Sequence, residues 1–418
     1  MTNINQYGWK ALVGSAVGYA MDGFDLLILG FMLSAISADL NLTPAQSGSL
    51  VTWTLIGAVV GGIVFGALSD RYGRVRVLTW TIVLFAVFTG LCAIAQGYWD
   101  LLIYRTIAGI GLGGEFGIGM ALAIEAWPAK HRAKAASYVA LGWQVGVLAA
   151  ALLTVLAAAL LTPVLLPHIG WRGMFVVGIF PAFVAWYLRV RLHEPEIFSQ
   201  KQTELSTQKI SKLESFKLLV KDKATTKVSL GVVVLTSVQN FGYYGIMIWM
   251  PNFLSKQLGF SLTKSGLWTA VTVCGMMAGI WIFGRLADRI GRKPSFLLFQ
   301  LGAVISIITY SQLTDPTAML VAGAFLGMFV NGMMGGYGAL MAEAYPTEAR
   351  ATAQNVLFNL GRAFIQHCDC FLGGDLCYRH GSDSLLSARI KRQRIELSAV
   401  KKIQVFENIG VKADVFYL

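Results

Sequence analysis

The sequence predicts an all-α membrane protein made of two pseudo-symmetric bundles of six helices, and three features predict it. Of the 418 residues, 56% are hydrophobic and 13% are charged, whereas a soluble domain carries roughly 25% charged residues. The apolar residues form long runs, so that about twelve spans of ~20 residues each fit into the chain. A short polar motif also occurs once in each half, which predicts an internal repeat.

The repeated motif lies between two apolar runs in each half, at residues 66–77 and 284–293. We interpret each copy as a tight turn between two helices at a membrane surface. Gly66 and Gly284 allow close helix contact, and the later glycines of the motif, Gly73 and Gly291, permit the turn. An aspartate in each copy can cap the next helix and pair with an arginine, while the other basic residues stay in water. These charged residues are Asp70, Arg71, Arg74, Asp288, Arg289 and Arg292.

The first half contains six expected spans, at residues 9–36, 50–68, 77–95, 101–127, 136–161 and 174–188. A polar stretch without Lys or Arg, residues 39–49, separates the first two. The motif follows the second span, residues 96–100 form the turn after the third, and Pro128 closes the fourth. The first apolar run contains Asp22 and Asp25, unlike a cleaved signal peptide, and is therefore expected to stay as a span.

The second half repeats this plan after a long polar segment, residues 189–227, which holds nine Lys or Arg. Spans are expected at residues 228–250, 267–286, 296–313 and 318–342, and Pro251 stops the first of them. The predicted domains are an N-terminal bundle at 1–192, a cytoplasmic linker at 193–227 and a C-terminal bundle at 228–364.

The eleventh span begins near Ala351, but its apolar run breaks after Phe364. Residues 365–418 form an atypical polar and basic tail, and three of the five cysteines lie between positions 368 and 377. We predict that the reading frame changes near Ile365, which would remove the last one or two helices. A native polar tail is the alternative. If no single-base shift in the resequenced DNA restores two apolar spans, the predicted change is wrong.

Much of the net charge of +12 lies in short loops between apolar runs. We attribute it to membrane orientation and not to nucleic-acid binding, because cytoplasmic loops carry the excess of Lys and Arg. The opposite loops offer only Arg172, Lys256 and Lys264. The N-terminus is therefore expected in the cytoplasm, with the chain in a bacterial inner membrane. The basic loops after spans 2, 4, 8 and 10 contain Arg71, Arg74, Arg76, Lys130, Arg132, Lys134, Arg285, Arg289, Arg292, Lys293 and Arg350.

The repeated motif resembles the signature loop of the major facilitator superfamily, whose fold is two six-helix bundles around a central substrate path. The stretch Asp22-Gly23-Phe24-Asp25 resembles the Asp-Gly-aromatic-Asp motif of the aromatic acid:proton symporter family and of sialic acid transporters in that superfamily. The resemblance covers about residues 9–362. It implies a secondary transporter in which these aspartates matter for transport. The general similarity is greatest to transporters of cis,cis-muconate.

Four charged residues inside predicted spans are candidates for proton coupling. Asp22 and Asp25 are spaced to share a helix face, and Asp22 lies about 20 Å into its span. A carboxylate at that depth is costly unless it is paired, protonated or in a water-filled cavity. Arg105 resembles the family's span-4 arginine linked to proton coupling, and Glu115 is another candidate proton carrier. The alternative for each of them is a structural contact with a neighbouring helix.

A glycine-rich stretch in the fourth span, residues 109–114, formally matches a dinucleotide-binding fingerprint. No strand precedes it and it lies inside an apolar run, so we reject that reading. Small residues at this spacing instead allow another helix to approach closely. No cofactor and no metal are expected.

Amide, phenol, indole and arginine side chains inside several spans form a candidate substrate-binding set. Such groups suit hydrogen bonds to a carboxylate or a ring substituent, and an arginine could bind a substrate carboxylate. Taken alone, each of them fits an interhelical contact better, and only as a set that faces one cavity do they indicate a substrate site. The set comprises Trp143, Gln144, Gln239, Asn240, Tyr243, Tyr244, Asn331, Tyr337, Asn355, Asn359 and Arg362.

Acidic and basic residues at the predicted cytoplasmic helix ends also repeat. Glu343 and Arg350 follow Glu125 and Arg132 by the same number of residues that separates the two copies of the loop motif. Together with Asp70 and Asp288 they could form ion pairs that close an inner gate and break when the bundles rock. The predicted gate also includes the loop-motif residues Gly66, Arg71, Gly73, Arg74, Gly284, Arg289, Gly291 and Arg292. A solvated charged face is the alternative.

The sequence therefore predicts a proton symporter that imports an organic acid anion by alternating access, such as an aromatic acid or a dicarboxylate like cis,cis-muconate. A sialate or sugar-acid symporter and a proton-driven exporter of drugs or metabolites are the alternatives on the same fold. A membrane enzyme or sensor is disfavoured because no catalytic motif and no sizeable soluble domain are present. The expected partners are the small acid, protons and the lipid bilayer, with a monomeric chain and no nucleic acid.

Overall fold

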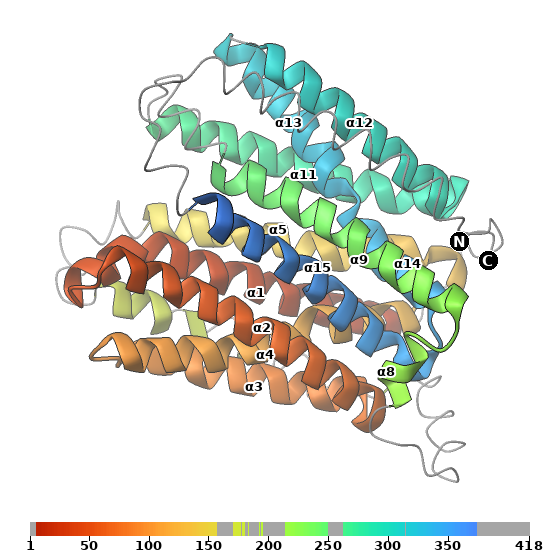
Figure 1. Cartoon of the computed structure of the whole chain (residues 1–418), viewed down its shortest axis with the longest axis horizontal. Coiled ribbons are helices and arrows are strands. Elements are labelled where there is room, and N and C mark those ends of the chain that lie inside the picture. The colour runs from red at the N-terminus through yellow and green to blue at the C-terminus, as the bar shows by residue number, and fades with distance from the viewer. Residues whose placement is uncertain are drawn as a thin grey trace.

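The computed structural model describes residues 6–156, 170–176, 178–179, 183, 192, 194, 214–249, 262–313 and 315–373. In this part of the chain all regular secondary structure is helical. Eight of the described helical segments are long and apolar enough to cross a membrane. Figure 1 shows the helices of residues 6–156 in the lower part of the view and those of residues 223–332 above them.

The first half forms α1 (Gln6–Asp39), α2 (Pro44–Tyr72), α3 (Arg74–Cys92), α4 (Tyr98–Glu125) and α5 (Arg132–Leu156), with a 3-10 turn before α5 at Ala129–His131. Thr43 caps α2 in a capping box with Gln46. The turn from α2 to α3 takes place at Gly73, whose φ of 112° favours glycine.

Helix α4 lies in the interior of this half. The membrane-spanning window of α4 is 89% buried, against 44% for α3. A Cβ atom on Gly113 would overlap the carbonyl oxygen of Ala58 in α2. The glycines of α4 therefore allow close helix packing, as predicted.

The second half forms α8 (Glu214–Leu218), α9 (Lys223–Tyr244), a π-helical turn (Gly245–Trp249), α11 (Leu262–Ile290), α12 (Arg292–Gln312), α13 (Pro316–Gly332), α14 (Met334–Ala344), a 3-10 turn (Thr347–Ala349) and α15 (Arg350–Gly373). One span was expected at residues 318–342, but the helix is interrupted at Met333. Glycines flank this point at positions 332, 335 and 336, and glycine weakens a helix interior.

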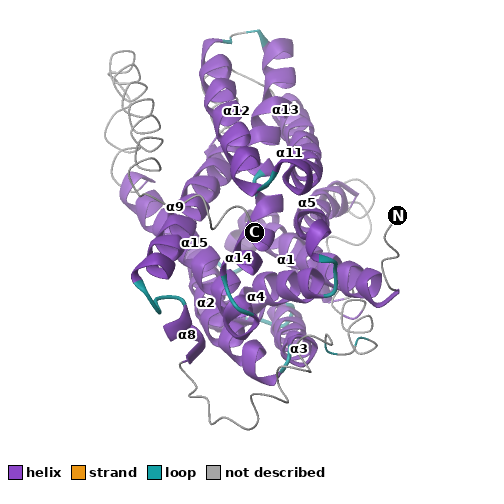
Figure 2. Cartoon of the chain, turned by 90° about the vertical axis from the view of Figure 1, so that its right-hand side faces the viewer, coloured by secondary structure: helices purple, strands orange, loops and turns teal. Residues whose placement is uncertain are grey.

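The two halves meet along two lines of helix contact, α2 against α15 and α5 against α11 and α14. Figure 2 shows the same arrangement from the side. One hydrophobic cluster runs through both halves and includes Phe116 and Trp143 from the first and Tyr243 and Phe358 from the second. The interface between the halves is thus a packed core around the molecule's centre.

The expected spans 1–4, 8 and 9 are confirmed as helices, with ends that differ by a few residues, and span 5 is helical as far as it is described. The expected span 7 is formed by α9 and the π-helical turn, and span 10 is formed by the two helices α13 and α14. Helix α15 continues to Gly373, past the point where the apolar run breaks. Most of the expected sixth span, most of the linker and residues 374–418 lie outside the described residues. The predicted change of reading frame remains a prediction.

Candidate functional site

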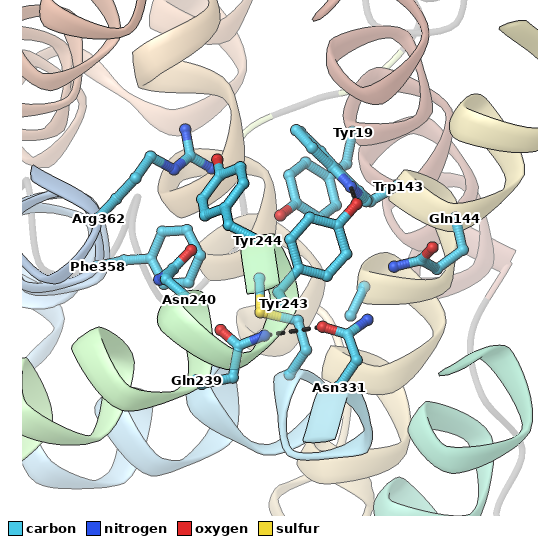
Figure 3. Close-up of a pocket in the computed structure, with 12 residues that line it drawn as sticks. Tyr19, Trp143, Gln144, Gln239, Asn240, Tyr243, Tyr244, Asn331, Phe358 and Arg362 are labelled. Atoms are coloured by element: carbon cyan, nitrogen blue, oxygen red, sulfur yellow. Dashed lines mark hydrogen bonds between the residues drawn. The ribbon is translucent and has the colours of Figure 1, made fainter. Parts of the chain in front are cut away.

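A pocket lies between the two halves, lined by residues of α1, α5, α9, α13, α14 and α15 (Figure 3). Eight members of the predicted substrate-binding set line it together with four residues that we did not predict. The lining residues are Tyr19, Ala140, Trp143, Gln144, Gln239, Asn240, Tyr243, Tyr244, Asn331, Met334, Phe358 and Arg362.

Aromatic side chains form much of the pocket wall. The Nε1 of Trp143 donates a hydrogen bond to the hydroxyl of Tyr243 at 2.9 Å, which joins the two halves. The rings of Tyr19 and Trp143 have centroids 5.2 Å apart. The ring of Phe358 is 4.3 Å from that of Phe116, which does not itself line this pocket. Flat apolar surfaces of this kind suit a planar organic ligand.

Arg362 brings a positive charge into this aromatic wall. It is only 7% exposed, and its guanidinium lies 5.3 Å from the ring centre of Phe358 and 5.9 Å from that of Trp143. Its Nε has no hydrogen-bond partner in the described part of the chain. None of the ion pairs between described residues involves Arg362. A buried cation in this setting is a favourable place for an anionic ligand.

Asp22 lines a second pocket next to the first. Tyr19, Trp143 and Arg362 border both pockets, and Asn359 and Thr54 border the second. Asp22 is 5% exposed. An acidic group and the arginine therefore face one shared space between the halves.

Asp25 has different surroundings from Asp22, inside the first half. Arg105 of α4 donates to its two carboxylate oxygens at 3.0 and 2.7 Å, and Thr89 of α3 donates at 3.2 Å. Both charged side chains are at most 1% exposed. Asp25 therefore has the structural contact with a neighbouring helix that was its alternative, while Asp22 borders the pocket.

Besides Asp25 and Arg105, three predicted proton-coupling or substrate-binding residues lie outside both pockets. Glu115 accepts a hydrogen bond from Thr81 of α3 at 3.3 Å, within the first half. Tyr337 donates to the carbonyl of Leu235 at 3.1 Å, and Asn355 accepts from the backbone N–H of Gly117 at 2.9 Å. The last two are interhelical contacts, the alternative that the sequence left open.

The predicted gate residues gather at the end of the bundles where residues 66–77 and 284–293 lie, which we call the loop-motif end. In the first copy, Arg74 pairs with Asp70 at 2.7 Å and with Glu125 at 3.2 Å. Glu125 also pairs with Arg350 of the other half at 3.0 Å. Asp70 accepts hydrogen bonds from the backbone N–H and hydroxyl of Thr352 at 2.8 and 2.6 Å, and so caps α15.

The second copy makes the reciprocal helix-capping contact, but its ion pairs between described residues stay within the second half. Asp288 accepts from the backbone N–H groups of Ala133 and Lys134 at 3.2 and 3.1 Å, and so caps α5. Arg292 pairs with Asp288 and Glu343 at 3.2 and 2.7 Å, within its own half. Among described residues, Arg132 makes no ion pair with Glu343 that would match the pair between Glu125 and Arg350. These contacts hold the halves together at the loop-motif end.

The other predicted gate residues serve mainly in packing or lie at the surface. Gly66 packs closely against Ala351 and Asn355 of α15, and Gly284 against Ser137 of α5. Gly291 takes a φ of 93° at the turn between α11 and α12. Arg71 and Arg289 are exposed.

The sequence analysis missed two residues that line the pocket and one that caps a helix at the loop-motif end. Tyr19 and Phe358 line the pocket, and their spacing of three and four residues from Asp22 and Arg362 was a usable signal. Glu194 accepts hydrogen bonds from the backbone N–H groups of Arg74, Val75 and Arg76 at 2.8, 3.0 and 3.1 Å, and so caps α3. No local pattern pointed to that contact.

Comparison with known proteins gives the family. The pattern of the Major Facilitator Superfamily matches residues 15–365. A Haemophilus influenzae protein whose name assigns it to metabolite transport is 87% identical over 366 residues, covering 87% of this chain and 88% of the relative. A cis,cis-muconate transport protein of Acinetobacter baylyi is 30% identical over 366 residues, covering 86% of each.

A solved structure of the proton:xylose symporter XylE has the same fold, with a TM-score of 0.70 at 20% identity, over 88% of this chain and 90% of that one. The family match ends at residue 365, where the apolar run of the eleventh span breaks. Because the family pattern covers most of the described structure, the chain belongs to the Major Facilitator Superfamily and is a membrane transporter and not an enzyme.

Proposed function

We propose that this transporter is a proton-coupled symporter that imports an organic acid anion by alternating access. The observation that carries the proposal is Arg362, a buried cation with no ion pair to a described residue, set in an aromatic pocket between the halves. A carboxylate can pair with the guanidinium while a conjugated or aromatic body packs on the rings. The muconate relative supports an aromatic acid or an unsaturated dicarboxylate as the cargo.

Protons are proposed to act at the acidic groups of α1. Asp22 borders the same space as Arg362, so a substrate anion bound to Arg362 changes the electrostatic environment of Asp22. Asp25 and Arg105 form a buried pair whose separation or protonation would alter how α1 packs on α4. Proton uptake and substrate binding are thereby linked through one helix.

The contacts at the loop-motif end support a state in which that end is closed. We propose that this end faces the cytoplasm, that the protein resides in the bacterial inner membrane, and that breaking these contacts opens the inward path. An exporter driven by protons is the alternative, because the same fold allows either direction.

The test is uptake of labelled benzoate or cis,cis-muconate into proteoliposomes under an imposed inward proton gradient. Accumulation that collapses with a protonophore is expected, and Arg362→Gln should abolish it while Arg362→Lys restores part of it. Asp22→Asn and Asp25→Asn should each lose gradient-driven accumulation. Proton-driven efflux with no uptake would favour the exporter, and accumulation that is unchanged in Arg362→Gln would overturn the proposed binding mode.

A further inference from the structure

Two amide side chains from different helices meet at the pocket wall. The Nε2 of Gln239 in α9 donates to the Oδ1 of Asn331 in α13 at 2.7 Å (Figure 3). Both side chains are buried, with 3% and 2% exposure, and both line the pocket. The remaining atoms of this amide pair, Gln239 Oε1 and Asn331 Nδ2, have no hydrogen-bond partner in the described part of the chain.

The amide pair presents one hydrogen-bond acceptor and one donor in either orientation of the amides. As drawn, the unsatisfied atoms are an acceptor on Gln239 and a donor on Asn331. If both amides turn over, Asn331 donates to Gln239, and the unsatisfied atoms become a donor on Gln239 and an acceptor on Asn331. The conclusion therefore does not depend on how the amide atoms are assigned.

Buried polar atoms without partners are costly, and a ligand group that satisfies both is correspondingly favoured. A hydroxyl group can donate to the acceptor and accept from the donor at the same time. An ionised carboxylate can only accept hydrogen bonds, and a ring C–H group neither donates nor accepts one here. The chemistry of the amide pair thus matches a hydroxyl.

A second unsatisfied acceptor lies nearby. The Oε1 of Gln144 in α5 also lacks a partner among described residues, and its side chain is 1% exposed. In Figure 3, Gln144 and Asn331 lie on one side of the pocket and Arg362 lies on the other, with Asn240 next to Phe358 and Gln239 at the bottom of the view. Gln144 and Asn331 therefore stand away from the cation.

We propose that the amide pair of Gln239 and Asn331 is a hydroxyl-binding subsite, so that the transported acid carries a hydroxyl group away from its carboxylate. This inference rests on the proposed function, because it takes the carboxylate to lie at Arg362. It favours hydroxylated aromatic acids or sugar acids as cargo over benzoate and over cis,cis-muconate, which has carboxylates at both ends and no hydroxyl.

The test compares acids that differ in one group, using the full chain in lipid nanodiscs and calorimetric titration. The ligands are benzoate, 3- and 4-hydroxybenzoate, and the matching methoxybenzoates, which keep the acceptor oxygen but lose the donor. We expect at least one hydroxybenzoate to bind about 10- to 100-fold more tightly than benzoate and than its methoxy counterpart.

The double variant Gln239→Met/Asn331→Leu should bring the hydroxybenzoate affinity down to that of benzoate. Gln354→Leu is the matched control, since Gln354 is a buried amide outside the pocket whose Oε1 also has no partner among described residues. It should keep the full preference. Retained benzoate binding in the double variant shows that the variant is folded.

Equal affinity for benzoate and both hydroxybenzoates in the unmodified protein would overturn the hydroxyl subsite and leave the proposed acid transport intact. A preference that survives in the double variant would also overturn it. Absence of binding for every acid, or acid binding that is unchanged in Arg362→Gln, would instead refute the proposed function on which the subsite rests.

Discussion

Loss of the charge on Glu125 should open the loop-motif end. Glu125 is the one described carboxylate there that pairs with arginines of both halves, with Arg74 at 3.2 Å and with Arg350 at 3.0 Å. The variant Glu125→Gln keeps the size of the side chain but removes the anion. Arg350 would then have no ion pair among described residues while the end is closed, and would gain water when it opens.

The magnitude follows from the burial of this group. Breaking a buried ion pair by removing one partner costs about 3–5 kcal/mol, and the Arg350 side chain is 9% exposed, which favours the lower end of that range. A cost of about 3 kcal/mol confined to the closed state shifts the ratio of closed to open molecules by about 100-fold. The open state then becomes the major one if it was populated at about 1% or more.

The assay is the distance between spin labels on exposed positions at the two sides of that end. Arg76→Cys lies in the first half and Lys293→Cys in the second, and both residues are exposed. The native cysteines are replaced by alanine. Glu125→Gln should add a longer-distance population and should reduce the transport rate, because the closed state is needed in each cycle.

Glu343→Gln is the matched control, since Glu343 pairs only with Arg292 of its own half among described residues. It should leave the distances nearly unchanged. If Glu125→Gln gives the same distances as the unmodified protein, or if both variants open the end equally, the reasoning is refuted. Thermal unfolding of each variant in the same detergent separates opening from loss of the fold.

Three other predictions concern stability, measured as thermal unfolding in detergent. Gly113→Ala should destabilise the protein by about 1–3 kcal/mol because its Cβ would overlap the backbone of α2, whereas Gly97→Ala, which meets no atom within 4 Å, should have little effect. Asp25→Asn should destabilise it by about 3–5 kcal/mol because its buried arginine partner loses its counter-charge; unchanged stability would contradict the pair's importance. Hydrogen bonds from Arg172, and then from Trp171, lower the pKa of Asp39. The ionised Asp39 therefore contributes stability above its ordinary pKa of about 4, and this contribution is lost as the pH falls through the lowered value. Asp39→Asn should remove this acid-sensitive part, and an identical pH profile for both proteins would contradict it.

The architecture was predictable from the chain because its signals are local or periodic. Long apolar runs, a motif repeated half a chain apart, and the charge of the short loops predicted a two-bundle transporter. The fold and the family comparisons confirm that class. Gly73 and Gly291 at the turns take positive φ, which only the chemistry of glycine permits readily, so these positions were readable without any tertiary information.

Which polar residues line the pocket and which make structural contacts depended on the tertiary structure. Helix periodicity placed Asp22 and Asp25 on nearly one face. Asp25 binds groups of α3 and α4, whereas Asp22 borders a pocket together with Arg362 of α15, and no local pattern determines which helix lies beside each turn of α1. Likewise, Tyr337 and Gln239 could not be told apart in the sequence, where both are polar residues inside predicted spans. In the structure, Tyr337 donates to a backbone carbonyl and Gln239 faces the pocket.

The sequence alone thus determined the fold class, the internal repeat and the types of residue available for transport. These features follow from hydrophobic patterning and backbone preferences, which depend on residues close together in the chain. The packing of the two halves decided which side chains face each other, and with it the capping of α15 by Asp70, of α5 by Asp288 and of α3 by Glu194. Each of these contacts joins residues far apart in sequence. Only a folded chain brings the carboxylate to the helix end that it caps.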